Sequence, residues 1–73
     1  MKKSVRETFG IRLKEAVEMS GKSYKELAEY IGVSKSTVSM YLHGKALPSL
    51  EVLSQISDFL DVSCDFLLGK KEL

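Results

Sequence analysis

The sequence has few of the residues that build cross-links and metal sites. Its 73 residues include one cysteine, one histidine and no tryptophan. The lone cysteine, Cys64, cannot form a disulfide within the chain and is typical of a reducing cytoplasm, where we expect it to be a buried or half-buried apolar side chain. The histidine, His43, has no cysteine or acidic partners at the spacing of metal ligands, so we expect no metal and no cofactor.

Long apolar runs are missing as well. No segment approaches the ~18 apolar residues that cross a membrane as a helix, and the N-terminus has no apolar signal-peptide core. The titratable side chains do not form a catalytic pattern, because there is no nucleophile–histidine–acid set and no glycine-rich phosphate loop. We therefore expect neither a membrane protein nor an enzyme, and at this size we expect no pocket for a small-molecule ligand.

The residues that are present suit one small folded domain. Hydrophobic residues make up 44% of the chain and charged residues 29%, which is typical of globular proteins with a limited core. The net charge is only +1, but residues 1–25 carry seven lysines and arginines against three glutamates, whereas residues 46–73 carry two lysines against five acidic residues. This asymmetry either orients the molecule on a polyanion or is an ordinary mixed surface.

The spacing of apolar residues predicts helices throughout the chain. Ser4 with Glu7, and Ser23 with Glu26, match the S-x-x-E capping box that begins a helix. Gly10 inside the first helix indicates either a close neighbour or simple tolerance. The predicted helices span residues 5–20, 24–31, 35–43 and 50–60, and a short fifth helix holds residues 66–68 and ends at Gly69. The predicted inner face of the fourth helix is Leu50, Leu53, Ile56 and Leu60, with Phe59 beside it.

Residues 23–44 have the pattern of a helix-turn-helix. Ala28 is small enough for two helices to cross closely, Gly32 can end the first helix and turn the chain, and Ser34 can cap the second. The apolar residues fall on one face of each helix. They are Leu27, Ala28 and Ile31 in the first helix, and Val38, Tyr41 and Leu42 in the second.

From Gly32 to Pro48 the sequence follows the pattern G-V-S-x-S-T-V-S-x-Y-x-x-G-K-x-x-P. This pattern resembles the lambda-repressor-like, Cro-type helix-turn-helix family. Residues 49–68 are similar to the fourth and fifth helices of that family, and the resemblance covers about residues 6–69. It implies an all-α, five-helix lambda-repressor-like DNA-binding domain. Residues 1–73 would be a single helix-turn-helix domain, with its core at about 5–69.

In such a domain the second helix of the motif enters the major groove, and its outward side chains meet base edges. Those outward positions are Lys35, Ser36, Ser39 and Met40, and the resemblance assigns base contact to Lys35, Ser36 and Met40. Contacts to the DNA backbone are expected from Tyr24, Lys25, Ser34, Thr37 and Lys45. The alternative for these residues is a solvated polar face.

The chain departs from the family pattern at several positions. Tyr24 stands where the family usually has glutamine, and it either donates its hydroxyl to a phosphate or packs over a neighbouring helix. Val17 and Leu42 replace an arginine and a glutamate that pair in many members, so we predict that these two side chains touch. Lys22 replaces an apolar residue and is expected near the DNA-facing side. His43, where the family often has asparagine, either contacts phosphate or favours the helix C-terminus as a cation.

These observations predict a cytoplasmic transcriptional regulator that binds double-stranded DNA sequence-specifically, a repressor from a bacterium or a phage. It would bind a palindromic operator as a homodimer and act by occlusion. The residues expected at the dimer interface are Phe59, Phe66, Leu67 and Leu68, with core closure as the alternative for Phe66 and Leu67. The rival interpretation is a protein-interaction module, such as an antitoxin or a bridging factor, with weak affinity for DNA.

Overall fold

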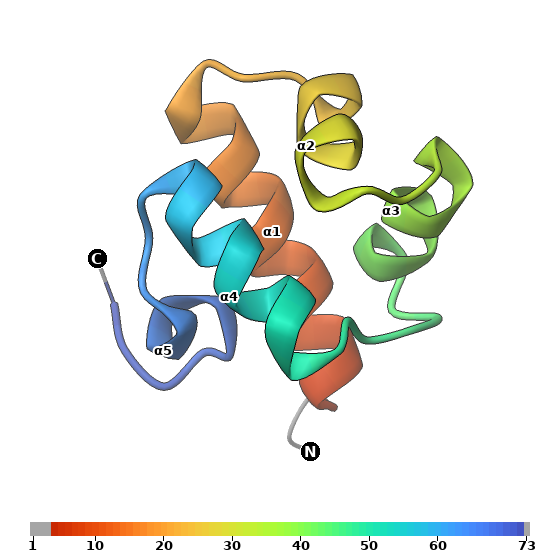
Figure 1. Cartoon of the computed structure of the whole chain (residues 1–73). Coiled ribbons are helices and arrows are strands. Elements are labelled where there is room, and N and C mark those ends of the chain that lie inside the picture. The colour runs from red at the N-terminus through yellow and green to blue at the C-terminus, as the bar shows by residue number, and fades with distance from the viewer. Residues whose placement is uncertain (1–3, 73) are drawn as a thin grey trace.

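The computed structural model describes residues 4–72, and within that range the chain forms five helices and no strand (Figure 1). The helices are α1 (Val5–Ser20), α2 (Tyr24–Ile31), α3 (Lys35–Leu42), α4 (Leu50–Leu60) and α5 (Cys64–Leu67). The all-α prediction is confirmed. Two predicted ends were too long, because α3 stops at Leu42 and α5 stops before Leu68. None of these helices is long and apolar enough to cross a membrane.

A serine precedes each of the five helices. Every one of these serine side chains accepts a hydrogen bond from the backbone N–H three residues further on, which satisfies a donor that the helix itself leaves free. At Ser4 and Ser23 the glutamate three residues later also accepts from the serine N–H, so both predicted capping boxes are present. Local side-chain chemistry therefore fixes where each helix begins.

Gly32 ends α2 and turns the chain toward α3. Its φ of 75° lies in the left-handed region, where glycine carries no steric penalty. The N–H groups of Gly32 and Val33 both donate to the carbonyl of Ala28, at 2.9 and 3.0 Å. This tight return lets α3 begin at Lys35, and it makes α2 and α3 the predicted helix-turn-helix.

The helix α1 runs through the middle of the molecule (Figure 1). The helices α3, α4 and α5 pack against α1, and α2 packs against α3 and α4. The helices α2 and α3 lie on one side of α1, while α5 lies on the other side, beneath the end of α4 (Figure 1). One hydrophobic core joins all five helices. Its buried members are Phe9, Leu13, Ala16, Val17, Leu27, Ala28, Ile31, Val38, Tyr41, Ile56, Leu60, Phe66 and Leu67.

The predicted inner face of α4 is right except at its first member. Ile56 and Leu60 are buried, and Leu53 packs against the core. Leu50 is 85% exposed, because it is the first residue of α4 and lies before the helix reaches the core. The periodic pattern could not show this, since the spacing of Leu50 fits the stripe equally well.

Gly10 marks the closest approach of α1 and α3. A Cβ atom at this position would lie 2.5 Å from the carbonyl oxygen of Leu42 and 2.8 Å from that of Tyr41. Glycine is therefore present because a neighbour occupies the space, which decides between the two alternatives from the sequence. At the same crossing, the rings of Phe9 and Tyr41 meet edge to face at 6.1 Å between centroids.

Val17 and Leu42 contribute to the same apolar cluster. Val17 is buried within it, and Leu42 is half-buried and packs against it. Both positions are thus apolar in an apolar environment, and the direct contact between the two side chains stays a prediction.

We predict that Gly10→Ala lowers the free energy of unfolding by about 1–3 kcal/mol, because overpacking must push the α3 backbone away. Helix propensity alone predicts the opposite sign, with alanine better than glycine by about 1 kcal/mol. Urea denaturation followed by circular dichroism measures the change. The exposed α1 variant Lys14→Ala is the control and is expected within about 0.5 kcal/mol of wild type. A Gly10→Ala protein as stable as wild type would contradict the close packing.

The capping box of α2 predicts a pH dependence of stability. The Ser23 N–H donates to the Glu26 carboxylate at 2.8 Å, and this bond, helped by the Ser23 hydroxyl and by Lys22, lowers the pKa of Glu26 below its ordinary value of 4.5. The pKa of Glu26 is therefore lower in the folded protein than in the unfolded chain. The ionised carboxylate stabilises the fold at pH values above the pKa of the unfolded chain, and this stabilisation is lost as the pH falls through the pKa of the folded protein.

Glu26→Gln should therefore lower the urea midpoint at pH 7, and the difference from wild type should shrink by pH 3. The variant Glu29→Gln removes the same charge from α2 without touching Ser23, and so separates the cap from the change in net charge. An equal loss at both pH values would show that the ionised carboxylate does not stabilise the cap.

Candidate nucleic-acid interface

The exposed face of α3 is determined by the buried side chains on the opposite side of the helix. Val38 and Tyr41 are buried in the core and hold the inner face of α3. The side chains on the other face are exposed, including Met40, which is 46% exposed although it is apolar. The four predicted base-contacting residues share this surface. They are Lys35, Ser36, Ser39 and Met40.

A cluster of three hydroxyl groups lies at the start of α3. The Ser34 Oγ is 2.9 Å from the Ser36 Oγ and 3.1 Å from the Thr37 Oγ1, and it also accepts from the Thr37 N–H at 3.2 Å. Two hydrogen bonds among three hydroxyls use two of the three protons. One proton of the cluster is thus left to donate to an acceptor outside it, as a base edge or a phosphate oxygen would be.

The first turn of α2 carries two of the expected contacts to the DNA backbone, Tyr24 and Lys25. Its N–H groups and the positive end of its dipole favour an anion at this end. Lys25 is exposed, whereas Tyr24 is half-buried and packs against the core, as the packing alternative predicted. Burial raises the pKa of the Tyr24 hydroxyl above its usual value, and the charge of Glu18 raises it further, so the group stays a neutral donor. A phosphate contact by this hydroxyl stays a prediction.

Hydrogen bonds hold the C-terminal end of α3 and the loop after it at two points. The His43 Nδ1 lies 2.8 Å from the Ser39 carbonyl oxygen, which can only accept, so this nitrogen carries the proton. The same nitrogen lies 3.3 Å from the Ser39 Oγ, which therefore accepts and keeps its own proton for an outside partner. The second tie is Arg6 of α1, whose Nη1 donates to the carbonyl of Lys45 at 3.1 Å.

Arg6 is a residue that the sequence analysis missed. It lies 39 residues before Lys45, and nothing in the spacing of either segment predicts the contact. The hydrogen bond holds the loop after α3 against the start of α1 and leaves the Lys45 side chain exposed. Arg6 therefore positions one of the expected phosphate contacts.

Two expectations about the molecular surface need correction. Lys22 was expected near the DNA-facing side, but its ammonium lies 5.0 Å from the centroid of the Phe59 ring, which in turn stacks on Tyr30. This cation–π contact directs Lys22 toward α4. Phe66 and Leu67 were offered as dimer contacts, but they are 3% and 0% exposed, so core closure is the correct alternative. Phe59 and Leu68 are half-buried and keep some surface.

Among the residues that the structure describes, the titratable side chains do not gather into a metal site. Across residues 4–72, no three histidine, cysteine, aspartate or glutamate side chains lie close enough together to hold a metal ion. Cys64 is half-buried at the start of α5, in agreement with the prediction.

Comparison with known proteins agrees with this geometry. Residues 13–67 match the family model described as helix-turn-helix. One relative is the SPbeta prophage-derived uncharacterized HTH-type transcriptional regulator YonR of Bacillus subtilis. The two sequences are 40% identical over a region that covers 82% of this chain and 56% of the relative. This chain is also 36% identical, over 90% of its length and 52% of the relative, to the HTH-type transcriptional regulator ImmR of the same organism. The chain thus spans about half the length of the curated relatives it matches.

A solved structure gives the same result in three dimensions. The restriction-modification controller protein C.AhdI from Aeromonas hydrophila superposes with a TM-score of 0.76 and 29% sequence identity, over 85% of this chain and 94% of that one. The sequence pattern, the arrangement of helices and both kinds of comparison agree: this chain belongs to the lambda-repressor-like, Cro-type helix-turn-helix family.

Proposed function

We propose that this chain binds double-stranded DNA in a sequence-specific way and is the DNA-binding part of a cytoplasmic transcriptional regulator. The observation that carries the proposal is the exposed face of α3, where Lys35, Ser36, Ser39 and Met40 project away from the core. The relatives named as transcriptional regulators support it. Residues 5–69 would act as one folded unit around the shared core.

The chemistry of the face suggests a division of roles. Lys35 can donate to the O6 and N7 atoms of guanine, Ser36 and Ser39 can donate or accept, and Met40 can pack on a thymine methyl group. The remaining expected contacts carry hydroxyls, cations or N–H groups that suit phosphate oxygens and would fix the register on the duplex. They are Tyr24, Lys25, Ser34, Thr37 and Lys45.

We further propose that two copies bind a palindromic operator and repress by occlusion. One helix reaches only a few base pairs, and a two-fold axis would place two copies of α3 about 34 Å apart on one side of the duplex. A relative named as a repressor supports the repressor role. It is the cryptic phage CTXphi transcriptional repressor RstR of Vibrio cholerae, which is 34% identical over 81% of this chain and 53% of the relative. Phe59 and Leu68 stay as dimer contacts because both keep exposed surface.

The rival function is a protein-interaction module with weak affinity for DNA. The modest net charge of +1 and the apolar Met40 on the exposed face of α3 favour it. The two functions predict different outcomes for the variants below, because an interaction module has no need of a cation at the start of α3.

The first test selects binding sites from a random pool of duplexes at two salt concentrations. We expect a palindrome, with two half-sites one helical turn apart. A dimer that neutralises about six phosphates should lose about a thousandfold in affinity between 50 and 200 mM salt. Weak binding without sequence preference at both concentrations would favour the interaction module.

The second test measures the affinity of Lys35→Ala for the selected site. Losing a base contact should weaken specific binding by about 1–3 kcal/mol, or about 5- to 150-fold, for each half-site, and relax the preference at one base pair of each half-site. Lys25→Ala should instead weaken all sequences alike and make the salt slope shallower by about one for each bound copy, or about two for the dimer. Lys70→Ala, a matched loss of charge on the exposed tail, is the control. Equal affinities for Lys35→Ala and wild type would remove Lys35 from the interface.

A further inference from the structure

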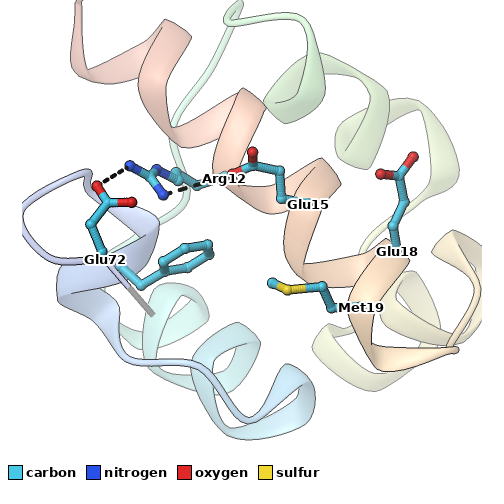
Figure 2. Close-up of a pocket in the computed structure, with 6 residues that line it drawn as sticks. Arg12, Glu15, Glu18, Met19 and Glu72 are labelled. Atoms are coloured by element: carbon cyan, nitrogen blue, oxygen red, sulfur yellow. Dashed lines mark hydrogen bonds and ion pairs between the residues drawn. The ribbon is translucent and has the colours of Figure 1, made fainter.

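A hollow of about 460 Å³ lies between α1 and α5. Its lining residues are Arg12, Glu15, Glu18, Met19, Phe66 and Glu72 (Figure 2). Its volume falls within the range of protein ligand sites. The helix α3 lies on the other side of α1 (Figure 1), so this hollow is separate from the exposed face of α3.

The hollow continues along α1 in both directions. A second hollow shares Arg12, Glu15 and Glu72 with the first and extends it to Ile11. A third shares Met19 and extends it to Val62. Together they form one depression along the outer side of α1, which we name the α1 groove.

The floor of the α1 groove alternates apolar and acidic side chains at helical spacing. Ile11 and Met19 are large apolar residues that are 43% and 52% exposed, and Glu15 lies midway between them. Residues four apart on a helix are neighbours on one face, about 6 Å apart along the axis. The strip therefore presents an apolar, an acidic and an apolar position in a row, within about 12 Å.

The charge of the α1 groove is acidic. Across the three hollows four carboxylates, those of Glu15, Glu18, Glu72 and Asp61, stand against two cations, Lys22 and Arg12. The main hollow holds three of the carboxylates against Arg12 alone. That guanidinium is already occupied, since it lies 3.0 Å from the Glu72 carboxylate, 3.8 Å from that of Glu15 and 4.8 Å from the centroid of the Phe66 ring (Figure 2). Two copies docked here by a two-fold axis would bring like charges together, so the complementary occupant is a cationic partner.

We propose that the α1 groove binds an amphipathic helix of a partner protein, with a lysine or arginine between two apolar side chains. Apolar residues at i and i+8 would contact Ile11 and Met19, and the cation at i+4 would pair with Glu15. This is the helix-in-groove mode of recognition, with anchors spaced by helical turns. The symmetric spacing accepts the partner helix in either direction. Because the groove and α3 are on different sides of α1, the partner and DNA can be bound together.

The test uses two synthetic helical peptides as probes. The first carries leucine at i and i+8 and lysine at i+4, and the second has glutamate in place of that lysine. Methyl-detected NMR titration of the full chain reports which residues respond. We expect saturable shifts at Ile11 and Met19 with the lysine peptide, and at least about tenfold weaker binding of the glutamate peptide, the usual scale for one close charge pair.

A charge swap makes the test specific. Glu15→Lys should lose about tenfold for the lysine peptide and gain about as much for the glutamate peptide, while its affinity for operator DNA is not reduced. Asp58→Lys changes the net charge equally on α4, outside the groove, and should leave the preference for the lysine peptide unchanged. Folding of both variants is checked by circular dichroism.

Three results would overturn the proposal. One is the absence of saturable shifts with the lysine peptide, and another is equal binding of both peptides. The third is a concentration-dependent shift of Ile11 and Met19 without any peptide, which would identify a second copy of the chain as the occupant. None of these results bears on DNA binding by α3, so the two proposals fail independently.

Discussion

The close approach of α1 and α3 is the constraint on which the rest of the structure depends. The helix α3 has eight residues, and a helix of that length is marginal in water without tertiary support. Its direction is set by α1: Gly10 lets the carbonyls of Tyr41 and Leu42 come within van der Waals distance, Phe9 meets the ring of Tyr41, and Arg6 binds the loop that follows. These contacts fix the direction in which the exposed face of α3 points.

The second structural pair is α2 with α4. Phe59 of α4 stacks on Tyr30 of α2 at 4.6 Å between ring centroids, and the ammonium of Lys22 lies 5.0 Å from the centroid of the Phe59 ring. An aromatic stack of this kind contributes about 0.5–1.5 kcal/mol beyond the area that it buries. It fixes the first helix of the motif to the body of the domain, as the contact at Gly10 fixes the second.

Val17 and Leu42 are apolar residues at two positions where the family often has a buried ion pair. Val17 is buried and Leu42 is half-buried in the core cluster, so neither position carries a charge that must be desolvated. Replacing a buried ion pair by apolar residues of similar volume is often neutral or stabilising. The five-helix arrangement therefore does not need the ion pair, since apolar packing and the Gly10 contact join α1 to α3.

The sequence by itself determined which elements form and where each helix begins. Five serine caps, two capping boxes and the glycine turn at Gly32 are local signals, because their hydrogen bonds join residues at most five positions apart. The periodic apolar stripes located most of the core. The same local pattern placed the exposed face of α3, because the inward positions Val38 and Tyr41 fix the outward ones.

Only the tertiary structure decided what depends on residues distant in sequence. The spacing of Leu50 fitted the inner face of α4, but its place at the helix end leaves it in solvent. The sequence allowed Phe66 to contact a second copy or to close the core, and the structure buries it against the core with the Arg12 guanidinium over its ring. The tie between Arg6 and Lys45 and the acidic groove along α1 likewise join segments far apart in the chain. Periodicity reports which side of a helix is apolar, whereas packing decides which part of that side is covered and by what.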